Sequence, residues 1–203
     1  MDLKQIFEER RSINFFDSTK SLDDSILRNI VNLAVTAPSA FNLQPWEIIA
    51  VKSDSAKKRL LQLSNNQPKI VEAPVTLIII GDKNGFSDAN PEWKVLESML
   101  GAEIVKGYQD FTKILYGSTE DRKTKFAESN ASLLAMSIMY AAKYYGVESH
   151  PLSGIDFEGI AKEFNITKDK NVVMLISLGY FDSSKELYPK RARKNFDKIV
   201  KLL

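Results

Sequence analysis

Two segments of the chain are almost continuously apolar and rich in β-branched residues. Residues 75–80 read Val-Thr-Leu-Ile-Ile-Ile, and residues 172–178 read Val-Val-Met-Leu-Ile-Ser-Leu. Strands of this kind are covered on both faces, because a strand with one solvated face alternates apolar and polar residues. A further strand is predicted over residues 48–51. The pattern therefore predicts a sheet sandwiched between helices.

Helical spacing of apolar residues predicts helices between and around these strands. They cover residues 2–9, about 21–35, about 54–63, 128–145 and 157–164. Ser21, with Asp24 three residues later, is predicted to cap the second helix, and Asp156 the last. Helix 128–145 is apolar on nearly all sides and ends at Gly146, a residue suited to a C-cap. We expect it to be the central core helix, at a subunit interface.

Composition excludes several classes of protein. With 203 residues, the chain is expected to form one domain over residues 1–203. The absence of cysteine excludes disulfides, thiolate catalysis and cysteine-ligated metal, and one histidine makes a metal site improbable. The net charge of +2 implies no nucleic-acid partner. The apolar run 131–142 is too short to cross a membrane, and without a signal-like N-terminus a cytoplasmic protein is expected.

Residues 37–46 carry the most informative polar groups. They read Ala-Pro-Ser-Ala-Phe-Asn-Leu-Gln-Pro-Trp, between a predicted helix and a predicted strand. Pro38 and Pro45 disfavour helical geometry in the residues before them. Ser39, Asn42 and Gln44 can hydrogen-bond a flat heteroaromatic ligand. Taken alone, the segment also fits an ordinary polar connection.

Basic residues gather in three places. Arg10 with Arg11, Lys69, and Arg191 with Arg193 offer cationic donors, and the fork of an arginine can bind two phosphate oxygens at once. Each group has a plainer interpretation as a solvated helix end or a solvated basic tail.

Three motifs in order give the chain a resemblance to a known family. They are Arg-Arg-Ser-Ile-Asn-Phe-Phe at residues 10–16, the segment 37–46, and Pro-Lys-Arg-Ala-Arg-Lys-Asn-Phe at residues 189–196. Apart from a variable middle at about 82–125, the chain resembles the FMN-dependent nitroreductases. That resemblance implies an α+β fold, a three-layer α/β/α sandwich with a mainly antiparallel central sheet. It also implies a homodimer that exchanges its C-terminal segments.

The resemblance implies an enzyme that takes hydride from NAD(P)H onto FMN and reduces nitroaromatics, quinones or similar small acceptors by ping-pong turnover. No catalytic side chain and no metal are expected. The residues it places around the cofactor are Arg10, Arg11, Ser12, Asn14, Pro38, Ser39, Ala40, Asn42, Gln44, Asn66, Gln67, Lys69, Pro151, Leu152, Ser153, Gly154, Arg191 and Arg193.

Roles follow from the same resemblance. Arg10, Arg11 and Ser12 would contact the phosphate and ribityl chain, and Arg193 would bind phosphate with Arg191 beside it. Asn66, Gln67 and Lys69 would contact the ribityl chain and the pyrimidine. Pro38, Ser39, Ala40 and Asn42 would approach the flavin ring from the other subunit.

The chain departs from the family pattern at two places. Asn14 stands where a lysine or arginine is usual, which leaves Lys69 as the expected stabiliser of the reduced flavin's charge. Ser153-Gly154 stands where some members have Glu-Gly, and the Gly154 N–H is still expected to face flavin N5. The one histidine, His150, is interpreted as structural.

Two other interpretations of the function remain open. A different reaction on the same cofactor, such as a dehydrogenation or a reductive dehalogenation, would depend on the variable middle. A binder of nucleic acid or another anionic ligand would use the basic C-terminal segment, and its binding would weaken steeply with salt. Phe196 and Ile199 interrupt that basic segment, which favours packing on a partner. A dinucleotide or Walker glycine motif is absent from the sequence, which disfavours a dedicated nucleotide domain.

Overall fold

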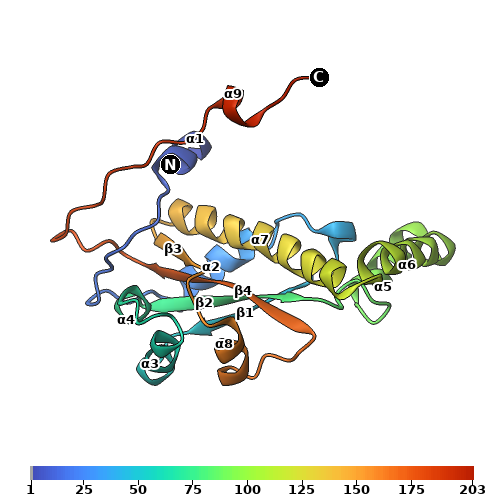
Figure 1. Ribbon diagram of the computed structural model, residues 1–203, viewed down its shortest axis with the longest axis horizontal. Coiled ribbons are helices and arrows are strands. Elements are labelled where there is room, and N and C mark those ends of the chain that lie inside the picture. Colours follow the sequence, from blue (N-terminus) through green and yellow to red (C-terminus); the bar gives the residue numbers. More distant parts are fainter. Residues whose placement is uncertain (1) are drawn as a thin grey trace.

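A computed structural model describes residues 2–203 and places a four-stranded sheet between two layers of helices (Figure 1). The strands are β1 (Trp46–Val51), β2 (Val75–Asp82), β3 (Glu148–Leu152) and β4 (Lys170–Gly179), in the order β1-β2-β4-β3. All three neighbouring pairs are antiparallel. The helices are α1 (Leu3–Glu9), α2 (Asp24–Ala34), η1 (Ala40–Asn42), α3 (Asp54–Gln62), α4 (Lys69–Glu72), α5 (Glu92–Leu100), α6 (Ala102–Gly117), α7 (Glu120–Tyr144), α8 (Phe157–Glu163) and α9 (Phe196–Ile199).

Each face of the sheet has its own hydrophobic core. On one face, Leu77 packs with residues of α2 and α7, among them Leu134. On the other face, Ile78 packs with residues of α3, α4 and α8, among them Leu60 and Ile160. Adjacent residues of β2 thus point to opposite cores, as the two-residue period of a strand requires. The predicted three-layer α+β arrangement is confirmed.

Helix α7 crosses the sheet and is the longest helix (Figure 1). Its 25 residues span about 37 Å at 1.5 Å per residue. At its C-terminal end the N–H groups of Gly146 and Val147 donate to the carbonyls of Lys143 and Ala142, at 3.1 and 2.8 Å. This double hydrogen bond is a Schellman cap, and Gly146 has the positive φ of 73° that it needs. The predicted C-cap is confirmed.

The other end of α7 was not predictable from apolar spacing. The helix begins at Glu120, eight residues before the predicted start, and the Thr119 side chain caps it. Residues 120–125 are all polar, so the first turns carry no periodic signal. The helix is also not buried on all sides, since Leu133 is 45% exposed and Tyr144 is 53% exposed.

The predicted cap of α2 is wrong. Asp23, and not Ser21, precedes the first helical residue, and its carboxylate accepts a hydrogen bond of 2.6 Å from the Ser25 N–H. Ser21 lies two residues too far upstream to reach the free N–H groups of the first turn. Asp156 caps α8 as predicted, by accepting from the Gly159 N–H at 2.9 Å.

The variable middle of the chain contains α5 and α6, which form a helical hairpin beyond the end of the sheet (Figure 1). Gly101 joins them with a φ of 87°. Three aromatic rings fasten the hairpin to η1, because Phe41 lies 5.8 Å from Trp93 and 5.3 Å from Tyr108, between ring centroids. The hairpin is therefore tied to the polar segment 37–46.

The chain after β4 runs along the outside of the molecule, passes α1 and ends beyond α9 (Figure 1). Its last residues are exposed and include Phe196, Ile199 and Leu202. Exchange of this segment across a homodimer stays a prediction. Among residues 2–203 there is no helix with the length and apolar character to span a bilayer.

Candidate functional site

The Arg10–Asn14 segment leaves α1 and runs beside strand β3. Ser12 forms a parallel bridge with Ser149, and the Ile13 N–H donates to the Ser149 carbonyl at 3.0 Å. Ile13 is buried in a small core with Phe16. Alternate residues of an extended segment point to opposite sides. Because Ile13 points into this core, its neighbours Ser12 and Asn14 face outward.

These residues line a cavity of about 650 Å³. Its wall comes from α1, residues 10–14, α7, β3 and the chain after β4. Most of its lining is cationic, hydroxylated or aromatic: Phe7, Glu8, Arg10, Arg11, Ser12, Asn14, Tyr140, His150, Tyr188, Pro189, Lys190, Arg191 and Arg193. The structure thus brings the first and third sequence motifs, 180 residues apart, to one cavity.

The C-terminal wall of the cavity is held by two contacts with the N-terminal segment. The Arg11 guanidinium donates to the Tyr188 carbonyl, and the Lys190 ammonium donates to the Glu8 carbonyl at 2.8 Å. Arg11 was predicted to contact phosphate, and in the structure it also fastens this wall. Arg193 donates to the Arg191 carbonyl at 3.1 Å, which keeps the two arginines together.

His150 lies on β3 and reaches the cavity beside residues 10–14. Its Nδ1 is 2.8 Å from the Ile13 carbonyl, which can only accept, so Nδ1 carries the proton. Burial and the positive charge of Lys69 lower the pKa of His150 to about 4. The imidazole is therefore neutral at pH 7. The bond to Ile13 agrees with the interpretation of His150 as structural, and its side chain also lies in the cavity wall.

A polar cluster links α4 to the turn after β3. The amides of Asn65 and Gln67 donate to the Gly154 carbonyl at 2.9 and 3.2 Å, and Lys69 donates to the Gln67 side chain at 3.3 Å. Burial lowers the pKa of Lys69. Asn66 stays a predicted cofactor contact, with an exposed side chain next to Asn65. Both asparagines have positive φ, of 50° and 52°.

The carbonyl of Gly154 is thus held by two donors, whereas its N–H has no partner among residues 2–203. The two bonds fix the peptide between Gly154 and Ile155, and the N–H of Gly154, in the preceding peptide, is free to donate. Pro151 is half-buried and Ser153 is exposed nearby. Leu152 packs into the core below α8, so any ligand contact there is limited to its backbone.

The segment 37–46 has an unusual backbone. Phe41, Asn42 and Gln44 all have positive φ, between 47° and 56°, which costs free energy for residues other than glycine. The Asn130 carboxamide accepts from the Ala40 N–H at 2.9 Å, and the Ser39 hydroxyl accepts from the Gln44 N–H at 3.0 Å. Five of the six non-glycine residues with positive φ in the described chain lie in this segment or at residues 65–66. Such strain gathers at binding sites.

Within one chain, this segment lies away from the cation-lined cavity. It contacts α7 at Asn130, whereas the cavity touches α7 at Tyr140. Ten helical residues separate these positions, a distance of about 15 Å. The Pro38, Ser39, Ala40 and Asn42 group predicted to face the cofactor from another subunit is therefore not part of this chain's own cavity.

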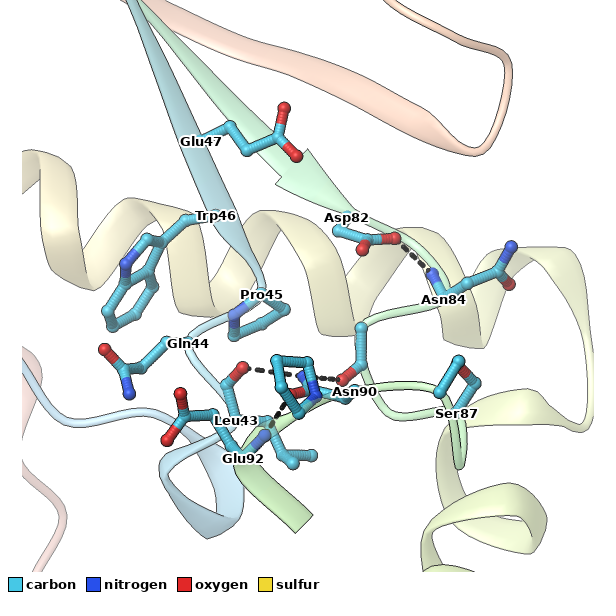
Figure 2. Close-up of a pocket in the computed structure, with 13 residues that line it drawn as sticks. Leu43, Gln44, Pro45, Trp46, Glu47, Asp82, Asn84, Ser87, Asn90 and Glu92 are labelled. Atoms are coloured by element: carbon cyan, nitrogen blue, oxygen red, sulfur yellow. Dashed lines mark hydrogen bonds between the residues drawn. The ribbon is translucent and has the colours of Figure 1, made fainter. Parts of the chain in front are cut away.

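Gln44 instead borders a cleft of about 300 Å³ between β1, β2 and α5 (Figure 2). Asn90 organises it, because its amide donates to the Leu43 carbonyl at 2.8 Å and its oxygen accepts from the Glu92 N–H at 2.9 Å. The charged residues of the lining are acidic, and burial raises the pKa of one of them, Asp82. This cleft is unsuited to a phosphate. The residues that the structure describes include no cluster of His, Cys, Asp or Glu arranged to hold a metal.

Acid is expected to destabilise the protein through His150. Its pKa is 6.5 when unfolded and about 4 when folded, so the unfolded chain binds the extra proton between these values. The contribution of the neutral His150 ring to the free energy of unfolding is complete above pH 6.5 and is lost as the pH falls toward 4. Urea unfolding of wild type and His150→Asn at pH 7, 6 and 5 tests this. Between pH 7 and pH 5 the wild type should lose more free energy of unfolding than the variant. The same dependence of that free energy on pH in both proteins would contradict the low pKa assigned to His150.

Comparison with known proteins shows which family of proteins the chain matches. The sequence model of the Nitroreductase family matches residues 7–180. The chain is 31% identical to "Putative NAD(P)H nitroreductase MhqN" of Bacillus subtilis (strain 168), over 100% of this chain and 99% of that protein. It superposes on the crystal structure of ydfN from Bacillus subtilis with a TM-score of 0.91, 30% identity and 98% coverage of both chains. A fold relative from Exiguobacterium sibiricum, crystallised in complex with FMN, has a TM-score of 0.86 at 23% identity, over 100% of this chain and 97% of that one.

Proposed function

The chain belongs to the nitroreductase family of oxidoreductases, and from this premise we propose that it binds FMN and oxidises NAD(P)H. Its acceptors are nitroaromatics, quinones or related small molecules, in ping-pong turnover. The observation that carries the proposal is the cavity in which the Arg10–Asn14 segment faces Arg191 and Arg193. The FMN complex of the fold relative supports the choice of flavin.

The side chains of the cavity fit the parts of FMN. Arg10, Arg191 and Arg193 offer fork-like donors to the phosphate, and charge-assisted bonds of this kind are the strong ones. Ser12 and Asn14 suit the hydroxylated ribityl chain. Arg11 divides its donors between the ligand and the C-terminal wall.

The pyrimidine end of the flavin would meet the polar cluster of α4 and the β3 turn. Gln67 and Lys69 supply donors there, and Asn66 lies beside them at the strained turn. Lys69 is half-buried, so its charge is poorly screened and acts strongly on a nearby anion. The unpartnered N–H of Gly154 is a further donor on the turn after β3.

The proposal includes a homodimer. The strained segment with Pro38, Ser39, Ala40, Asn42 and Gln44 lies about 15 Å along α7 from this chain's cavity, so it would serve the cavity of a second copy. The exposed apolar side chains of the C-terminal segment, with Leu202 at 80% exposure, support burial against a partner. A monomer that retains its flavin would contradict this part.

Bound FMN supplies the two-electron redox chemistry. The turn at Gly154 would orient the ring, and Lys69 would compensate negative charge on the reduced flavin. No proton donor is needed from the protein. His150 cannot act as one near pH 7, because its pKa is about 4.

Lys69→Ala is therefore expected to slow reduction of the bound flavin or to lower its potential, because Asn14 offers no replacement charge. His150→Gln should leave reduction within a few-fold of wild type, whereas loss of a true acid costs ~100-fold or more. Stopped-flow bleaching of the flavin by NAD(P)H measures both. A large loss of the reduction rate in His150→Gln at full flavin occupancy, with an unchanged rate in Lys69→Ala, would reverse the roles assigned to these two residues.

An anaerobic reductive titration of the purified holoprotein tests the proposed function as a whole. The protein should be yellow after dialysis, release one FMN per chain on acid precipitation, and bleach with NADH or NADPH. Release of FAD, or of no flavin, would refute the cofactor. A salt-dependent affinity for nucleic acid without flavin would favour the anionic-ligand binder.

A further inference from the structure

His150 lines the cation-lined cavity and has one polar atom, Nε2, without a hydrogen-bond partner among residues 2–203. The Nδ1–H of its ring is committed to the Ile13 carbonyl at 2.8 Å. A neutral imidazole with one nitrogen protonated has a lone pair on the other, so Nε2 is a hydrogen-bond acceptor. The low pKa of about 4 keeps this state throughout the neutral range. The atom is thus fixed in both position and polarity.

Few of the hydrogen-bond acceptors in this cavity are held in a fixed position. Arg10, Arg11, Lys190, Arg191 and Arg193 can only donate, and they suit the phosphate end of a ligand. A hydroxyl group that donates its proton needs an acceptor. The side chains able to accept are Glu8, Ser12, Asn14, Tyr140, His150 and Tyr188. Among them His150 is the one that a side-chain hydrogen bond to the backbone anchors, within the described residues 2–203.

We infer that His150 is a cofactor-binding residue whose Nε2 accepts a hydrogen bond from a hydroxyl of the ribityl chain. The inference rests on the proposed FMN function and deepens it. The position agrees with the strand pairing, because the bridge between Ser12 and Ser149 brings the predicted ribityl contacts beside His150. A phosphate oxygen accepts hydrogen bonds, so it is not a partner for an Nε2 that also accepts.

Two substitutions separate the ligand contact from the backbone anchor. In His150→Asn the amide nitrogen lies near the position of Nδ1, so the bond to the Ile13 carbonyl is kept and the cavity-facing acceptor is lost. In His150→Gln the longer side chain carries an amide oxygen to the position of Nε2. The first variant should bind FMN more weakly, and the second should recover the affinity.

The experiment measures dissociation constants of the apoprotein for FMN and for its 2′-, 3′- and 4′-deoxyribityl analogues by fluorescence titration. Wild type should bind at least one deoxy analogue about tenfold more weakly than FMN. His150→Asn should bind FMN about tenfold more weakly than wild type and should no longer distinguish that analogue. His150→Gln should bind FMN within about threefold of wild type.

The outcomes are distinguishable. If wild type binds FMN and His150→Asn binds FMN and every analogue as wild type does, the inference is overturned while the proposed function stands. If His150→Asn binds weakly but still discriminates the analogues, the loss arises from altered structure and the inference is also overturned. Failure of wild type to bind FMN would overturn the proposed function together with the inference.

Discussion

Arg10→Ala and Arg193→Ala are each expected to weaken FMN binding by about 10- to 100-fold. Both arginines line the same cavity, one from the segment after α1 and one from the C-terminal segment. Each would make charge-assisted hydrogen bonds to a dianionic phosphate, which contribute roughly 1.5 to 3 kcal/mol apiece. Isothermal titration of the apoprotein with FMN measures the loss.

The same titration with riboflavin shows where the loss arises. Riboflavin lacks the phosphate, so its affinity should change little in either variant. Arg122→Ala is the matched arginine control, since Arg122 is exposed at the start of α7, outside the cavity. Lys201→Ala, in the exposed last residues, should also have little effect. Equal FMN affinity in all four variants would show that the phosphate lies elsewhere.

Leu134→Ala is expected to lower the free energy of unfolding by about 2 to 5 kcal/mol. Leu134 lies on α7 with no exposed surface, in the core between this helix and the sheet. Removing its branched end leaves a cavity that the packed strand residues cannot fill. Urea unfolding at fixed protein concentration measures the change, because a dimer's stability depends on concentration.

Leu133→Ala is the control on the adjacent residue. Its side chain is 45% exposed in the described chain, so truncation should cost less than half as much as at Leu134. Similar losses for the two variants would contradict the assignment of α7's buried face. They would instead place Leu133 in an equally well-packed environment, such as a subunit contact.

The sheet and its two helical layers were predictable because they depend on local pattern. The apolar runs at residues 75–80 and 172–178 could be stable only with both faces covered, and each face has a separate core. The end of α7 was predictable for a similar reason, since Gly146 adopts a φ that other residues avoid. The start of α7 was not, because residues 120–125 are polar on every side.

The sequence predicted which segments form the candidate site, but not how those segments are arranged in space. The basic pairs at Arg10-Arg11 and Arg191 with Arg193 were identified from their motifs, and the fold brings them to one cavity. The bond from Asn65 to the Gly154 carbonyl was not predicted, because it depends on the strained turn that holds Asn65 and Asn66.

The sequence by itself determined the layers of the fold, the family and the residue types available to a phosphate-bearing cofactor. These follow from side-chain polarity and from the spacing of residues along the chain. The tertiary structure alone decided which of those residues share a cavity and in what protonation state. His150 illustrates the difference, since its low pKa comes from burial and from Lys69, 81 positions away in sequence. Such coupling depends on distance in space, which residue order does not specify.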